Sequence, residues 1–340
     1  MGIPERQALI SKIEEKRASL VVTYITSTRS NMEVQMAMDC IRKIYDHIKN
    51  NSAKKNIDLY LMSNGGEGTV PWRLVSLIRE YTNKFSVIIP YRAFSAATLT
   101  ALGADEIVMH PMGMLGPTDP TVANLFNPVD PQGQPLGISV EDVTAYLALI
   151  KEDAGIQHES ELIHAFNHLA DKVHPLALGN VKRSLSQSRM MATKLLQQSM
   201  TGRKDNHKIR EIVDNLTSKS YFHGHPINRK EAHTHVGLNN VIDPDSELEN
   251  LIWELYLDYE SEMLLEQPFD PITEFISSFP NLNPGTPNIT NEKEAKLAFI
   301  ETKGMTDYLS AKYQILGTKN PNGSIQIQVS QYGNSWKKLP

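Results

Sequence analysis

The chain has 340 residues, of which 40% are hydrophobic and 21% are charged, as is ordinary for a globular protein with a substantial core. Its 34 basic and 39 acidic residues give a net charge of −5, and no dense Lys/Arg run is interleaved with aromatic residues, so no nucleic-acid partner is expected. There is no secretory-type apolar stretch near the N-terminus, no run of the roughly 20 apolar residues that a membrane span requires, and only one cysteine, Cys40. We therefore expect a cytoplasmic protein with no transmembrane segment and no intrachain disulfide.

The first 110 residues alternate between strand-like and helix-like patterns. Continuous apolar and β-branched character over 20–26 predicts a buried strand, and apolar residues at spacings of three and four over 32–48 predict an amphipathic helix. Further strands are predicted over 58–62, 85–91 and 106–110, and further helices over 71–81 and 95–104. Such alternation predicts parallel strands with helices packed on the sheet, so the expected fold class is α/β.

The rest of the chain divides into helical, proline-rich and β-like stretches. The composition of residues 115–137 predicts a long irregular loop. Helical spacing follows over 140–151, over 158–198 with a break at His174-Pro175, and over 229–235 and 245–266. Five prolines between 268 and 287 indicate a linker, and alternating residues around the turn at Asn322-Gly323 indicate β-structure. The sequence thus predicts a domain over 1–266, a Pro-rich linker over 267–295 and a small β appendage over 296–340.

A glycine pair follows the predicted strand at 58–62. Gly65 and Gly66 permit backbone conformations that side chains forbid, so successive N–H groups can point into one site and bind an oxyanion. Glycine-rich strand–helix turns are common, however, so this turn indicates a functional site only in combination with neighbouring motifs.

Ser95 stands where a predicted strand ends and a helix begins. Its hydroxyl would lie beside N–H groups that lack intrahelical partners, including that of Ala96, and such a position suits nucleophilic attack. Serine is also a preferred N-cap residue, so capping of the helix is the alternative role.

Three segments carry a resemblance to a known family: S-N-G-G at 63–66, A-F-S-A-A-T-L-T-A-L-G-A-D-E-I-V-M at 93–109, and L-G-P-T-D-P at 115–120. Their order resembles the Clp protease and crotonase superfamily, in which a Gly-Gly turn precedes a strand–helix turn that bears the nucleophile. More narrowly, they look like the serine dehydrogenase proteinase group, related to signal peptide peptidase A, and the likeness covers roughly residues 20–259. It implies a Clp/crotonase-like spiral of repeated β-β-α units with helical elaboration, assembled as a homo-oligomer.

The resemblance also implies a serine peptidase acting on a peptide or protein substrate. In this mechanism Ser95 attacks an acyl carbonyl while the amides of Gly65 or Gly66 and of Ala96 hold the oxyanion. The position of the Clp-type histidine is taken by the residues at 116–119 instead. Peptidases related to signal peptide peptidase A use a later lysine, which implies a general base at one of three positions: Lys172, its neighbour His174, or Lys151.

Three further polar residues lie near these motifs. Asp119 either orients the base or caps its proline-framed turn. His223 and His225 flank a glycine in a predicted loop, where they line the active-site cleft or bind a metal; the first role is favoured because no cysteine lies nearby. We expect no metal and no cofactor, since neither a pyridoxal-binding lysine motif nor a dinucleotide fingerprint is present.

Two other functions fit the same residues. The fold could be a catalytically inactive scaffold that has lost its base and recruits a partner through the C-terminal β-structure. It could also be a crotonase-like acyl-CoA enzyme, in which the same amides polarise a thioester carbonyl and Ser95 is not a nucleophile.

Overall fold

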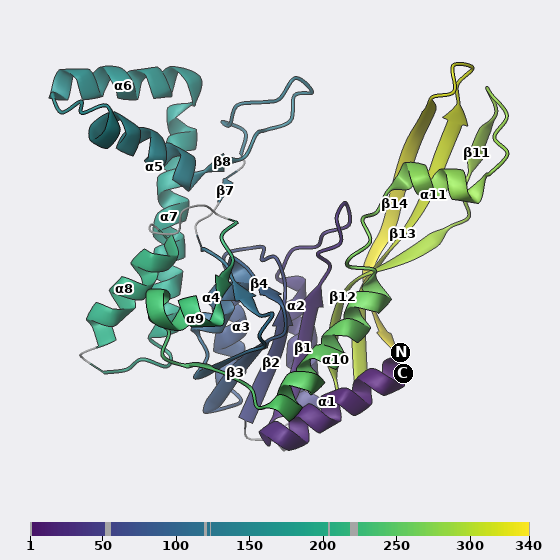
Figure 1. Ribbon diagram of the computed structural model, residues 1–340, viewed down its shortest axis with the longest axis horizontal. Coiled ribbons are helices and arrows are strands. Elements are labelled where there is room, and N and C mark those ends of the chain that lie inside the picture. Colours follow the sequence, from purple (N-terminus) through teal and green to yellow (C-terminus); the bar gives the residue numbers. More distant parts are fainter. Residues whose placement is uncertain are drawn as a thin grey trace.

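The computed structural model describes residues 2–51, 56–118, 121–122, 124–202, 205–217 and 224–339, with the backbone alone at 121–122 and 140–141. Within these ranges a nine-stranded mixed sheet forms the centre of the molecule (Figure 1). Across the sheet the strands are β10 (Val241–Ile242), β5 (Glu106–Met109), β3 (Lys84–Ile89), β2 (Asn56–Met62), β1 (Leu20–Thr26), β12 (Lys293–Thr302), β13 (Met305–Lys319) and β11 (Pro287–Ile289), with β14 (Ile325–Leu339) beside β13. This large mixed sheet with packed helices confirms the predicted α/β fold class and is consistent with a ClpP/crotonase-like fold.

Strands β1, β2, β3, β5 and β10 pair in parallel, as the strand–helix alternation predicted. Successive residues of β1 face opposite layers: Val22 packs with the helices of one layer, and Val21 packs with those of the other. The first layer holds α2 (Asp39–Asn50), α3 (Val70–Arg79) and α4 (Ala96–Leu102), and the second holds α1 (Ile3–Arg17) and α10 (Ser246–Met263). Both faces of the parallel strands are therefore covered, which explains why all seven residues of β1 are buried.

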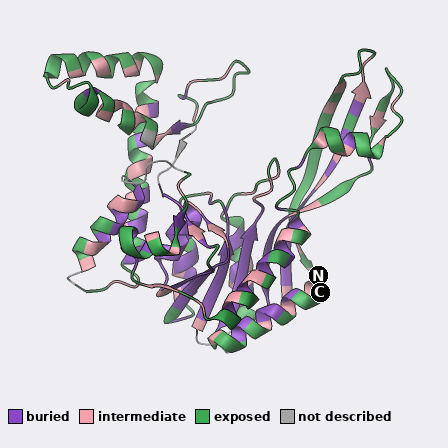
Figure 2. Ribbon diagram, in the orientation of Figure 1, coloured by how far each residue is buried: buried purple, intermediate pink, exposed green. Residues whose placement is uncertain are grey.

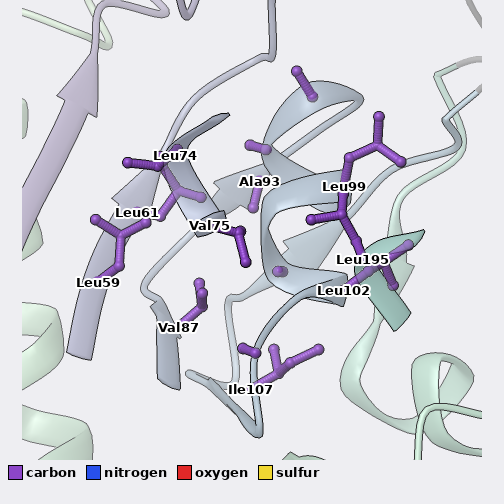
Figure 3. Packing of buried hydrophobic residues seen from close by; sticks show 14 of the residues in the cluster. Leu59, Leu61, Leu74, Val75, Val87, Ala93, Leu99, Leu102, Ile107 and Leu195 are labelled. Atoms are coloured by element: carbon purple, nitrogen blue, oxygen red, sulfur yellow. The ribbon is translucent and has the colours of Figure 1, made fainter. Parts of the chain in front are cut away.

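Helix α4 is buried along its whole length. Figure 3 shows Leu99 and Leu102 of α4 beside Leu195, while Val75 fills the space toward the strands. Burying one such side chain contributes about 1.5–3 kcal/mol. The start of α4 is thereby held at a fixed place above the sheet.

A helical arm leaves the first layer. Helix α7 (Pro175–Leu196) packs against α4 near its C-terminus, and its other end carries α5 (Val140–Ala148), the π-helical turn η1 (Leu149–Asp153) and α6 (Glu159–Lys172) (Figure 1). Figure 2 shows that this outer end is mostly exposed, and α6 has no buried residue. None of the helices in the described ranges is both long and apolar enough to cross a bilayer.

The remaining elements are short. Near the start of α4, β4 (Arg92–Ala93), β6 (Met114–Leu115) and β9 (Ile227–Asn228) form a small sheet, and β7 (Thr121–Val122) pairs with β8 (Ile138–Ser139). The other helices are α8 (Asp205–Thr217), α9 (Arg229–Glu231), η2 (Ala232–Val236) and α11 (Pro271–Ser278).

The C-terminal strands, predicted as a small β appendage over 296–340, are joined to the main sheet. Strand β12 pairs antiparallel with β1, with Thr23 opposite Glu301, so it extends the main sheet. The predicted linker over 267–295 contains α11, β11 and the first residues of β12, and β11 pairs with β13. The outer part of the β13–β14 hairpin projects beyond the rest of the sheet, together with β11 and α11 (Figure 1). The β1–β12 pairing joins residues as far apart as Thr23 and Glu301, 278 positions along the chain, which local pattern cannot indicate.

A buried ion-pair cluster fixes this junction. The guanidinium of Arg6 on α1 donates to Glu301 of β12 (Nε to Oε2, 2.9 Å) and to Asp258 of α10 (Nη1 to Oδ1, 2.7 Å). All three side chains have 0% exposure, and the Tyr259 hydroxyl also donates to Glu301. Two helices and the strand β12 therefore meet at one buried cation.

His47 on α2 joins the same region from the other layer. Its Nδ1 lies 2.8 Å from Thr302 Oγ1, and its Nε2 lies 3.2 Å from Asp307 Oδ2. Burial lowers the pKa of His47 from 6.5 to about 4, although the carboxylate of Asp307 opposes this shift. The folded protein thus holds a neutral imidazole at this position near pH 7.

We expect acid to weaken the fold through this histidine. The unfolded chain takes up the proton near pH 6.5 and the folded chain only near pH 4, so lowering the pH from 7 to 5 costs about 2 kcal/mol of unfolding free energy. Urea unfolding at pH 7 and at pH 5 measures the free energy of unfolding at each pH. In His47→Gln the loss of unfolding free energy between the two pH values should be smaller by about 2 kcal/mol. The exposed His168→Gln should behave like the parent protein. An unaltered pH dependence in His47→Gln would contradict this assignment.

Candidate active site

The glycine turn after β2 is hydrogen-bonded to the segment that precedes Ser95. The amide of Ser63 donates to the carbonyl of Arg92 (2.9 Å), and the amide of Phe94 donates to the carbonyl of Ser63 (3.0 Å). The Ser63 hydroxyl lies inside the turn, where it accepts from Thr26 Oγ1 at 2.7 Å. These bonds fix the turn and the start of α4 relative to each other.

Gly65 lies against Ser95. A Cβ at position 65 would stand 2.8 Å from the Cβ of Ser95 and 2.7 Å from the carbonyl oxygen of Phe94, and the backbone at Gly65 has a φ of 99°. Both the close approach and the left-handed conformation require glycine. The turn and the serine therefore meet, as the sequence predicted.

Ser95 itself occupies an unusual backbone conformation, with φ 50° and ψ −112°. Its side chain makes no capping hydrogen bond to α4, although the residue stands at the N-cap position. It is half-buried and lines a cleft. The capping role that the sequence left open is therefore not what this hydroxyl does.

The amides around Ser95 differ in their hydrogen bonding. The Gly65 amide donates to Ser63 Oγ (3.0 Å) and is already satisfied. No acceptor among the described residues receives the amide of Gly66 or that of Ala96. Gly66 is held from behind by Met36, whose amide donates to the Gly65 carbonyl at 2.8 Å. Two residues that line the cleft with Ser95 thus have amides without an acceptor among the described residues.

A cleft of about 470 Å³ contains the serine and both glycines. Its walls come from the segment after β1, the glycine turn, the start of α4, the segment after β6, and the middle of α7. In that order the lining residues are Glu33, Val34, Gln35, Asn64, Gly65, Gly66, Gly68, Ser95, Ala96, Leu99, Thr118, Ser184, Gln187 and Ser188. The sequence analysis missed the α7 wall, because three polar residues within a long helix give no signal of a cleft. Within this lining, Glu33 is the one ionisable side chain.

The three base candidates lie on the arm. Lys151, Lys172 and His174 are exposed, and none lines the cleft. His174 caps the start of α7 by accepting from the amide of Leu176 at 3.2 Å, ten positions before Ser184. Ten helical residues span about 15 Å, so His174 is far from the cleft wall along this helix.

The other predicted site residues have different positions. Asp119 and His223 fall outside the described residues. His225 lies before β9, and its Nε2 contacts Glu231 Oε1 at 2.7 Å. The small sheet β4-β6-β9 brings this pair near the start of α4, but His225 is not among the residues that line the cleft.

The chain is similar to several known proteins. A family model described as ClpP-like SDH-type serine proteinase matches residues 2–189. The chain is 38% identical over 66 residues to the uncharacterized protein MJ1495 of Methanocaldococcus jannaschii, covering 19% of this chain and 23% of that protein. It is 28% identical over 175 residues to the uncharacterized protein MJ0137 of the same organism, covering 49% and 60%. The chain thus spans less than two thirds of the length of either relative.

Two solved structures of the 1510-N membrane-bound stomatin-specific protease are also similar. One, in complex with a substrate peptide, has a TM-score of 0.36 at 15% identity and covers 62% of this chain and 70% of its own. The other has a TM-score of 0.35 at 14% identity and covers 63% and 76%. The family match spans more than half of the chain, and with the serine and its glycine turn inside that span, the chain belongs to the ClpP-like SDH-type serine proteinase family.

Proposed function

We propose that this protein is a serine peptidase that cleaves peptide bonds through an acyl-enzyme on Ser95. The observation that carries the proposal is the uncapped hydroxyl of Ser95, which lines the same cleft as Gly66 and Ala96, two residues whose amides have no acceptor among the described residues. In the proposed step the serine oxygen attacks the scissile carbonyl and its proton passes to a base. The base then protonates the leaving amine, and water later hydrolyses the acyl-enzyme.

The amides of Gly66 and Ala96 form the proposed oxyanion hole. Gly65 is excluded from this role because its N–H is bound to Ser63 Oγ. Both remaining donors are backbone groups, held in place by β4 and by the Met36 contact, so they need no rearrangement when charge develops on the oxygen. One such donor is worth about 10²–10³ in rate.

The proton acceptor in this proposal is Lys172, His174 or Lys151. Since all three lie on the arm and outside the cleft lining, each would reach Ser95 after movement of the arm or from the arm of another subunit. The homo-oligomer implied by the sequence resemblance would supply such a neighbouring arm. Alanine variants at the three positions identify the base, because only replacement of the true base should lower the rate at which Ser95 reacts.

Covalent labelling tests the nucleophile directly. A fluorophosphonate should modify the folded protein at Ser95 alone, identified by mass spectrometry of the peptide that contains it, because phosphonylation follows the geometry of acyl transfer. Prior unfolding in urea should remove the reaction. A folded protein that stays unmodified at Ser95 would refute the proposal.

A catalytically inactive scaffold is the second candidate. It is favoured by the cleft lining, in which the described residues include neither lysine nor histidine. A scaffold would bind an extended peptide with the same affinity before and after Ser95→Ala and would not react with the fluorophosphonate.

A further inference from the structure

The described lining of the cleft that contains Ser95 has a single charged side chain, Glu33. This residue is exposed, and its carboxylate forms neither a hydrogen bond nor an ion pair with any residue that the structure describes. The rest of the lining is neutral, because it consists of apolar residues, glycines, and serine, threonine, asparagine and glutamine side chains. The lining thus carries one negative charge that no described cation pairs with.

The segment that bears Glu33 is held against the glycine turn. The amide of Val34 donates to the carbonyl of Ser27 (2.9 Å), and the amide of Met36 donates to the carbonyl of Gly65 (2.8 Å). Glu33 stands three positions before Met36, so the Cα atoms of these two residues lie within about 11 Å of each other. The carboxylate is therefore close to the turn that contacts the proposed nucleophile.

The helical wall of the cleft supplies no compensating cation. Lys182 and Arg183 directly precede Ser184 on α7, yet neither lines the cleft, and Arg183 donates to Asn180 of the same helix. Glu67 of the glycine turn is exposed and adds a second negative charge on the side of Glu33. The charges at the described lining and at its glycine turn are therefore all of one sign.

A charge in a cleft acts on a substrate even without direct contact. Coulomb interactions extend over about 8 Å at physiological ionic strength, and the low-dielectric walls of a cleft focus the field of the charges that line it. A positively charged substrate side chain near Glu33 would therefore be stabilised, whereas a substrate carboxylate would be repelled.

We propose that Glu33 makes the cleft select peptides that carry an arginine or lysine side chain close to the scissile bond. This inference rests on the peptidase function proposed above and adds its substrate class. Arginine and lysine have long, flexible stems, so they can reach this carboxylate from more than one position of the peptide. Glu33 would determine specificity by pairing with that cation and would take no part in the chemical step.

Matched phosphonate probes test the effect of charge. In tripeptidyl diphenyl phosphonates, arginine or its neutral near-isostere citrulline replaces alanine at one position at a time. At the position nearest Glu33, the parent protein should react about fivefold faster with the arginine probe than with the citrulline probe, as expected for an ion pair that solvent partly screens. Raising the NaCl concentration to about 1 M should lower this ratio below about two, because the Debye length falls to about 3 Å.

Charge changes at Glu33 should control the same ratio. It should fall to about one in Glu33→Gln and below one in Glu33→Lys, because the second change repels the arginine probe. The control variant is Glu80→Gln, which removes the same charge at an exposed position outside the cleft lining and should keep the ratio near its parent value. Each ratio compares two probes on one variant, so partial unfolding of a variant does not alter it.

The two proposals fail in different ways. Equal rates with arginine and citrulline at every position, or a ratio that survives in Glu33→Gln, overturn this inference and leave the peptidase function intact. A parent protein that reacts with none of the probes, the all-alanine probe included, overturns the peptidase function and the substrate class with it.

Discussion

Replacing Ser95 with alanine should lower kcat/KM for peptide hydrolysis by about 10⁴-fold or more. The amides of Gly66 and Ala96 would still polarise a carbonyl, but no atom could form the acyl-enzyme, and loss of a nucleophile in comparable enzymes removes most of the rate. Progress curves with a quenched fluorescent peptide library, followed by a substrate drawn from it, measure the effect.

The matched control is Ser186→Ala on α7. This serine is exposed, donates to the carbonyl of Lys182 and does not line the cleft, so hydrolysis should match that of the parent protein. Circular dichroism should show that both variants are folded. Undiminished hydrolysis in Ser95→Ala would assign the nucleophile elsewhere and remove the basis for the proposed function.

Arg6→Met should destabilise the protein by about 3–5 kcal/mol. The methionine can fill the space, yet the carboxylates of Asp258 and Glu301 would remain buried without their cation. Denaturant unfolding, with the midpoint shifting at constant m-value, gives the free energy. Because α1, α10 and β12 meet at Arg6, we expect the loss to affect the whole sheet.

Lys16→Met, on the same helix, is the control variant. It also removes a positive charge, but from the surface, so it distinguishes the loss of a buried cation from the loss of charge alone. Lys16 pairs with Asp245 and Glu247 at the surface, where such pairs contribute less than about 1 kcal/mol. The prediction fails if the two variants have similar free energies of unfolding, or if Arg6→Met is as stable as the parent protein. Either result would show that the buried cluster does not stabilise the packing of the C-terminal strands.

The fold was predictable where local pattern decides it. The parallel strands and their helices follow from apolar runs and spacing, and the predicted meeting of Gly65, Gly66 and Ser95 at one cleft agrees with the structure. The sequence does not tell which of the two glycine amides lacks an acceptor. This depends on the Ser63 hydroxyl, which accepts from the Gly65 amide, a contact that only the structure shows.

Other features lay beyond the sequence because they join distant segments. The pairing of Thr23 with Glu301 across β1 and β12 brings a charged residue into the core, where only the distant Arg6 makes it acceptable. Likewise, Thr118 joins the cleft through bonds to Leu216 and Ser188, which no spacing rule relates to it. Several helix boundaries shifted by a few residues, whereas α2 begins at Asp39, seven residues after the predicted start at residue 32.

Holding a serine at φ 50° raises the free energy of the folded chain by about 1 kcal/mol or more, since L side chains disfavour this backbone region. The surrounding packing of α4 offsets that penalty. Glycine would adopt this backbone conformation without the steric penalty, so a hydroxyl is presented at position 95 at the expense of some stability.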